Sequence, residues 1–234
     1  MLFATYNIHF GLGTDNVYDV ARIADVVAEA DIVCLQEVVQ GWALNAHADQ
    51  AREIAERLNR YAWFHGPFDA DASSVGADGR IVNRRRTFGN AVLSRWPILE
   101  ARGHLLPKTA MPTQFDLQRG FVEAVIDTPT GRLRVYSIHL SHITHAQRLP
   151  QIEALLDIVL DAPRRGGAWD AHASDSFVFT EVAQPVPAAA IVMGDFNFTP
   201  SDVEYAAICG ETHPLFGRVA TADHLSDAWI AAGN

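Results

Sequence analysis

Four short apolar segments each end in polar side chains that packing does not require. They are residues 5–9, 35–38, 137–142 and 193–197. Between them lie stretches with helical spacing, such as Val20, Ile23, Ala24 and Val27 at i, i+3, i+4 and i+7. This alternation predicts one α/β domain in which helices cover the sheets. Because α/β folds gather their sites at strand ends, the polar ends indicate where the chemistry lies.

The first third of the chain predicts two helices and two strands. The first helix can be capped by Asn16 or Asp15, and a second follows at 51–58. A buried strand at 32–35 ends at Gln36 and Glu37, and another strand spans 61–64. The polar, glycine-containing stretch from Asp69 to Arg86 is expected to form a surface loop.

The remainder predicts further strands and helices. The strands are expected at 90–94, 120–127, 133–140 and 189–193, with a hairpin turn at 128–131. One helix carries Ile152 and Leu155 on its apolar face, with Pro150 near its first turn. A later helix at 201–209 has Thr199 as its expected cap and stops at Gly210. The long segment 163–187 is expected to fold near the site as a flap through its aromatic residues Trp169, Phe177 and Phe179.

Composition excludes several classes of protein. Hydrophobic residues make up 49% and charged residues 20% of the 234, which is a globular mixture rather than a disordered one. No apolar run approaches the roughly 20 residues of a membrane span. The formal charge is −10, which argues against tight binding of double-stranded nucleic acid. Two cysteines and the lack of a signal peptide favour a cytoplasmic location.

Convergence of the four polar ends would create a metal-assisted site. Mg²⁺ prefers oxygen ligands and is commonly held by one or two carboxylates together with substrate phosphate. Glu37 and Asn7 suit that role. Asp195 could orient or deprotonate a water molecule, and His139 could stabilise charge on phosphate oxygens.

These segments resemble motifs of the endonuclease/exonuclease/phosphatase superfamily, the metal-dependent phosphoesterases related to DNase I, neutral sphingomyelinases and inositol polyphosphate 5-phosphatases. The matching motifs are Thr-Tyr-Asn-Ile-His at 5–9, Leu-Gln-Glu-Val at 35–38, Gly-Asn-Ala-Val-Leu-Ser-Arg at 89–95, Ser-Ile-His-Leu at 137–140 and Gly-Asp-Phe-Asn at 194–197. Each is weak alone, but all five occur in the family's order. The resemblance implies a four-layer α/β/β/α sandwich and a Mg²⁺ or Mn²⁺ cofactor. It also implies Glu37 as the principal metal carboxylate assisted by Asn7, His139 and Asn197 on phosphate, and Asp195 aligning the water.

The end of the chain departs from the family pattern. The family ends with an Asp-His pair on a late strand, whose histidine is the acid/base partner. Asp223-His224 has these letters, but the residues after it look like those that precede the family's last strands, so we reject it as the pair. We therefore expect residues 1–234 to be a single domain of this family that is incomplete at its C-terminus.

Three further residues are candidates for substrate binding. His9 lies two positions from Asn7, on the same side if the strand continues. Asn90 is either a turn residue or a phosphate contact. Arg119 precedes a strand, where it could bind phosphate or pair with a surface acid. His142 and His145 are assigned to a surface turn and a helix start, outside the site.

The leading hypothesis is a metal-dependent phosphoesterase in which water attacks phosphorus in line. The acidic composition favours a small or lipid-like phosphodiester as substrate, although a phosphomonoester is compatible with the same core. One alternative is a nuclease acting on single-stranded or short nucleic acid. The other is a binding module that keeps the pocket but has lost catalysis.

Overall fold

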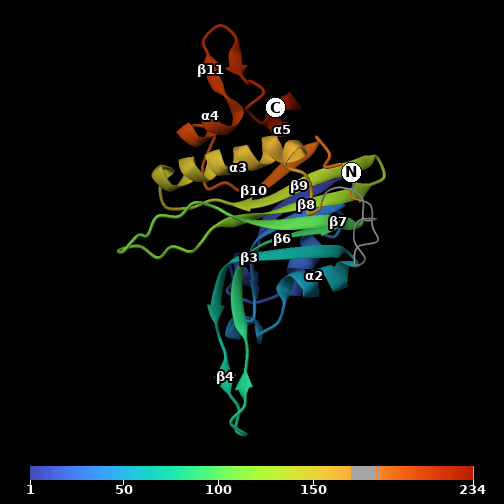
Figure 1. The fold of residues 1–234 in the computed structure, drawn as a ribbon, viewed down its shortest axis with the longest axis vertical. Helices are drawn as coiled ribbons and strands as arrows, with labels where there is room; N and C mark the ends of the chain where they lie inside the picture. The colour runs from blue at the N-terminus through green and yellow to red at the C-terminus, as the bar shows by residue number, and fades with distance from the viewer. Residues whose placement is uncertain (170–182, 184, 234) are drawn as a thin grey trace.

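Two four-stranded β-sheets stack face to face, and helices cover both outer faces (Figure 1). This arrangement is seen in a computed structural model that describes residues 1–169, 183 and 185–233. The four-layer α/β/β/α architecture expected from the sequence is confirmed.

The first sheet has the strand order β1-β2-β6-β3. Its members are β1 (Phe3–Asn7), β2 (Ile32–Gln40), β6 (Arg85–Ser94) and β3 (Tyr61–Asp71). The β1–β2 pair is parallel, and the other pairs are antiparallel. Helices α1 (Val20–Val26) and α2 (Gln50–Leu58) pack on its outer face through residues such as Ile23 and Ile54.

The second sheet has the order β10-β9-β8-β7. Its members are β10 (Ala190–Asp195), β9 (Gly131–His139), β8 (Gly120–Thr128) and β7 (Ile98–Leu105). Strand β7 was not expected from the sequence. Helices α3 (His145–Arg165) and α4 (Val203–Cys209) cover the outer face, where Ile152 and Leu155 are fully buried.

Alternation along the strands builds the core between the sheets. In β2, Val33 and Leu35 face the helices, whereas Ile32 and Cys34 face the second sheet. Buried polar side chains join the sheets as well: Gln36 Nε2 donates to Ser137 Oγ at 3.2 Å. The two sheets are therefore held in fixed register close to the polar ends of β2 and β9.

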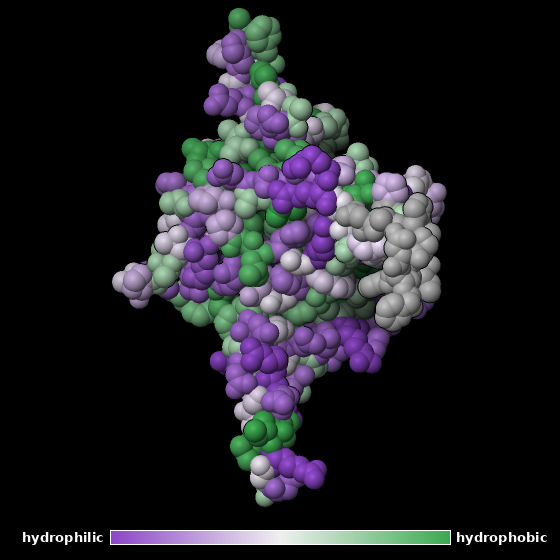
Figure 2. Space-filling view, viewed as in Figure 1, coloured by the Kyte–Doolittle hydropathy of each residue, from purple (hydrophilic) through white to green (hydrophobic). Residues whose placement is uncertain are grey.

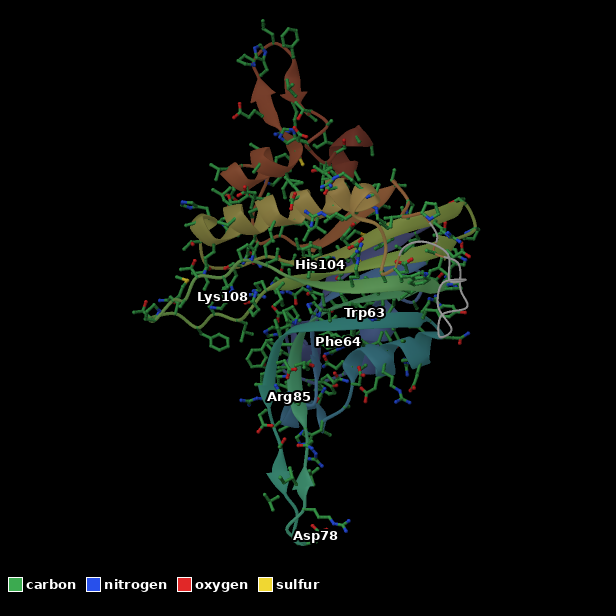
Figure 3. The ribbon with its side chains drawn as sticks, viewed as in Figure 1. Trp63, Phe64, Asp78, Arg85, His104 and Lys108 are labelled. Atoms are coloured by element: carbon green, nitrogen blue, oxygen red, sulfur yellow. The ribbon has the colours of Figure 1, made fainter. Side chains whose placement is uncertain are left out.

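The stretch expected to be a surface loop is instead a projecting β-arm (Figures 1 and 3). Strands β3 and β6 pair out to Asp71 and Arg85, and the short strands β4 (Ser74–Val75) and β5 (Ile81–Val82) extend the hairpin towards Asp78. The arm forms because the backbone pairing of β3 with β6 continues beyond the sheet and is followed by the β4–β5 pair. Its side chains lack a regular apolar pattern, so the sequence predicted a loop there. Val75 and Ile81 are each 70% exposed and form an apolar band on the arm (Figure 2).

Helix starts differ from expectation by a few residues. Asp19 rather than Asp15 or Asn16 caps α1, because its carboxylate accepts from Arg22 N at 2.9 Å. Asp202 rather than Thr199 precedes α4. Helix α3 begins at His145 after the Thr144 cap, so Pro150 lies in its second turn and not its first.

The C-terminal region adds a small hairpin, β11 (Glu211–His213) and β12 (Gly217–Val219), and the short helix α5 (Ala228–Ala231). Two short 3-10 turns, η1 (His9–Gly11) and η2 (Ala43–Asn45), complete the elements. The expected flap falls largely on 170–182, outside the described residues, as do Phe177 and Phe179. Over the part of the chain that is described, no helix is long and apolar enough to cross a membrane.

Candidate functional site

The amide of Asn7 joins two carboxylates that come from distant parts of the sequence. Its Nδ2 donates to Glu37 Oε1 at 3.1 Å and to Asp195 Oδ2 at 3.0 Å. Asn7 ends β1, Glu37 lies in β2, and Asp195 ends β10 in the other sheet. The structure thus brings together three of the residues that the sequence predicted to converge, across 188 positions of chain.

Glu37 lies inside a strand rather than at its end, which corrects the expectation from the sequence. Strand β2 continues to Gln40, but its pairing with β6 shifts between Leu35 and Val38. At this bulge Glu37 adopts a φ of 57°, a left-handed conformation that is strained for a non-glycine residue. Because of the bulge, the side chain of Glu37 does not follow the regular alternation of β2 between the two faces of the sheet. The Oε2 atom of Glu37 is buried without a hydrogen-bond partner.

His139, Arg119 and His142 form a second group beside the carboxylates. Arg119 Nη1 lies 3.0 Å from Nδ1 and 3.2 Å from Nε2 of His139, and its Nη2 lies 3.0 Å from His142 Nδ1. Arg119 is only 7% exposed, so it does not pair with a surface acid. Burial and the adjacent guanidinium lower the pKa of His139 to about 3, which leaves a neutral imidazole that can accept a hydrogen bond.

Asp195 and Asn197 are fixed by the backbone after β10. Asn197 N donates to Asp195 Oδ1 at 3.0 Å, and Asn197 Nδ2 donates to Leu140 O at 3.0 Å. His139 Nε2 lies 3.9 Å from Asp195 Oδ2. Gly194 allows β10 to lie close to β9 at this point, because a Cβ there would lie 2.0 Å from Ile138 O. The Gly-Asp-Phe-Asn segment therefore positions its aspartate against both Asn7 and His139.

The remaining predicted residues are located differently from expectation. Strand β1 ends at Asn7, so His9 is not on a continuing strand; it begins the turn η1, and its side chain is exposed. Asn90 lies in β6 and not in a turn, and a phosphate contact at this residue stays a prediction. It is 2% exposed between the sheets, where its Nδ2 donates to Gly120 O at 2.8 Å. This bond anchors the start of β8 next to Arg119.

Sequence reasoning assigned His142 to a surface turn, yet its ring contacts Arg119. The available signal was the spacing of His139 and His142, which lie three residues apart at the end of a strand and could therefore contact the same group. An open cleft of about 430 Å³ is lined by Asn7 and Asp195 but not by Glu37. The rest of its lining includes Thr5, Gln36, Phe196 and Phe198. Asp223 and His224 do not join this group: His224 Nδ1 accepts from Thr221 N in a local turn.

The donor set fits a hard divalent cation. Glu37, whose Oε2 has no hydrogen-bond partner, and Asp195 supply carboxylate oxygens. The amide of Asn7 presents its Nδ2 to both carboxylates, while its Oδ1 accepts from His9 N. Among the described residues there is no cluster of three or more His, Cys, Asp or Glu side chains suited to a metal. Carboxylate oxygens are ligands that hard divalent cations prefer.

The fold and the site match a known family. The family model described as "Endonuclease/Exonuclease/phosphatase family" matches residues 4–229, so the chain belongs to that family. The family's description covers endonucleases, exonucleases and phosphatases; its members are usually hydrolases and generally depend on divalent metal ions.

Solved structures agree with this assignment. An endonuclease/exonuclease/phosphatase protein from Beutenbergia cavernae has a TM-score of 0.55 and 25% identity, covering 86% of this chain and 48% of its own. The chain thus spans about half the length of that protein. A mannosyl-6-phosphatase from Bacteroides thetaiotaomicron has a TM-score of 0.53 and 20% identity, covering 88% and 69%. Humanized D. rerio TDP2 has a TM-score of 0.52 and 20% identity, covering 98% and 75%. No curated protein matches the chain.

Proposed function

We propose that this protein is a Mg²⁺- or Mn²⁺-dependent phosphoric ester hydrolase. The observation that carries the proposal is the Asn7 amide, which bridges the carboxylates of Glu37 and Asp195 from opposite sheets. Glu37 and Asn7 would hold the metal ion. When bound, the ion would supply positive charge to a phosphate oxygen.

The protein's own side chains would perform the remaining steps. Asp195 would orient the attacking water, because its Oδ2 faces Asn7 while its Oδ1 is fixed by Asn197 N. Arg119 and the one N–H of neutral His139 would donate to the phosphate oxygens, since both side chains are buried beside the carboxylates and a guanidinium matches phosphate geometry. Asn197 would contact the same oxygens or hold the loop in which it lies.

The substrate we propose is a small or lipid-like phosphodiester. The formal charge of −10 supports this, because a long polyanion would be repelled by most of the surface. One observation favours the alternative of short, single-stranded nucleic acid: the arm carries Arg84 and Arg86, for which no ion pair exists among the described residues.

The test is an activity screen in Mg²⁺ and in Mn²⁺. It compares bis-p-nitrophenyl phosphate, p-nitrophenyl phosphate, sphingomyelin and single-stranded DNA, for wild type and Glu37→Gln. We expect metal-dependent hydrolysis of a diester that the substitution abolishes. The midpoint of thermal unfolding is measured as well, so that metal binding is tested separately from turnover. Mg²⁺ at ten times its Kd should stabilise wild type by about 1.4 kcal/mol and leave Glu37→Gln unchanged.

Two results would count against the proposal. Equal stabilisation of wild type and Glu37→Gln by Mg²⁺ would show that the ion binds elsewhere. Metal binding without turnover of any ester would favour the binding-module alternative.

A further inference from the structure

A chain of aromatic rings leads from the site towards the arm. Phe88 lies with its ring centroid 6.4 Å from that of His139, and the Arg119 guanidinium sits 6.0 Å over the Phe88 ring. Phe10 follows at 5.2 Å from Phe88, and Trp42 at 6.4 Å from Phe10. Phe88 is buried, but Phe10 and Trp42 are only half-buried. The rings therefore form a wall, which is buried at Phe88 beside His139 and Arg119 and partly exposed at Phe10 and Trp42.

The far end of this wall carries a cation. Phe68 lies 6.0 Å from Trp42, and the Arg86 guanidinium sits 5.4 Å over the Trp42 ring. Arg86 is exposed at the base of the arm, and no carboxylate of the described chain pairs with it. The indole is itself immobilised, because Trp42 Nε1 donates to Thr87 O at 2.8 Å. The Arg86 guanidinium and the Trp42 ring are thus held together at the end of the series of rings that begins at Phe88.

The backbone beneath Phe10 is held in a costly conformation. His9 and Phe10 have φ values of 44° and 59° in succession, which non-glycine residues rarely adopt. Fully buried Gln50 donates to Phe10 O at 2.6 Å and accepts from Val39 N at 2.8 Å, and thereby ties this turn to β2. Glycine would adopt these φ values without strain. The presence of Phe10 at this position is therefore compatible with a role for its side chain in contacting a ligand.

We propose that Phe10, Trp42, Phe68 and Arg86 form a subsite for the aromatic group of a phosphate ester. This rests on the proposed function, because the ester's phosphate would occupy the His139 and Arg119 side. Stacking on aromatic faces and on guanidinium suits a planar ring. A saturated hydrocarbon group on the ester would remove water from the Arg86 guanidinium without offering it a new interaction, and this desolvation costs free energy. The ring could be a nucleobase or a simple aryl group, which share this chemistry.

The test compares ligands of equal size that differ in planarity. Calorimetric titrations in Mg²⁺ measure the Kd of inorganic phosphate, phenylphosphonate and cyclohexylphosphonate, neither phosphonate being hydrolysable. We expect phenylphosphonate to bind wild type about five- to tenfold more tightly than cyclohexylphosphonate. Trp42→Leu and, separately, Arg86→Gln should reduce this preference below twofold while leaving the Kd of inorganic phosphate unchanged. Trp229→Leu, in α5, is the matched control and should behave as wild type.

Each other outcome has a definite meaning. Equal Kd values for the two phosphonates, with phosphate still bound, would overturn the subsite and leave the proposed function intact. Loss of inorganic phosphate binding in both Trp42→Leu and Arg86→Gln would show that these residues only support the fold. Failure of wild type to bind phosphate at all would overturn the proposed function as well. Thymidine 5′-monophosphate binding more tightly than phenylphosphonate would identify a nucleobase as the ring; weaker binding would identify an aryl group.

Discussion

Glu37→Gly should be more stable than Glu37→Ala, although both variants remove the proposed metal ligand. Glu37 is held at a φ of 57°, where a Cβ is unfavourable. Comparison of Glu37→Ala with Glu37→Gly isolates the backbone, because neither variant keeps the carboxylate or its bond to Asn7. The difference between the two variants therefore measures the strain stored at the bulge.

The magnitude follows from two opposing effects. A left-handed conformation costs a non-glycine residue roughly 1–2 kcal/mol. Glycine has greater freedom in the unfolded chain, which costs the folded state about 0.5–1 kcal/mol. The net gain for Glu37→Gly over Glu37→Ala should be about 1 kcal/mol, which corresponds to a rise in Tm of about 2–4 °C for a chain of this size.

The assay is urea unfolding without added metal, followed by circular dichroism. Ala46→Gly is the matched control, because Ala46 is exposed at a φ of 53° and lies outside the site. It should gain a similar 1 kcal/mol without altering metal binding. A Glu37→Gly variant no more stable than Glu37→Ala, together with a stabilised Ala46→Gly, would refute the claim that the bulge is strained.

Two further changes test the supports of the site. Gln50→Leu should destabilise the protein by about 2–4 kcal/mol in urea unfolding, because Phe10 O and Val39 N both lose a buried partner; a loss below 1 kcal/mol would mean that water replaces both bonds. The pKa of His139 is lowered to about 3 from 6.5, so its neutral form stabilises the fold above pH 6.5 and that contribution is lost as pH falls towards 3. Between pH 6.5 and 4, wild type should therefore lose stability more steeply than His139→Gln, by at most about 1.4 kcal/mol per pH unit, and parallel pH curves would contradict this.

The sequence predicted most of the strands that carry the site, because their apolar runs and polar ends are local features. It missed β7, where Gly103 and charged residues interrupt the apolar pattern. Gly103 is required by a tertiary contact, since a Cβ there would lie 2.3 Å from His65 Nδ1. The arm was missed for a related reason: its pairing is made by the backbone, whereas its side chains are polar or exposed.

The site residues were predictable by type but not by geometry. The apolar run that contains Leu35 appeared to end at Glu37, although β2 continues through Val38 and Val39. Only the pairing of β2 with β6 shows that a bulge intervenes. The hairpin predicted at 128–131 already pairs β8 with β9, as the structure has it. Arg119 and His142 were undervalued because the pairing of two strands does not tell which side chains beyond their ends come into contact.

The strained residues explain how so sparse a site can be rigid. Three non-glycine residues with positive φ, His9, Phe10 and Glu37, lie in two segments that flank Asn7, and each segment is held by bonds from elsewhere in the fold. Asn7 Oδ1 accepts from His9 N at 3.0 Å, while its Nδ2 binds both carboxylates. The same side chain thus stabilises the unfavourable turn and orients the proposed ligands. It follows that the carboxylates are preorganised before a ligand binds, so that binding need not supply the free energy of ordering them.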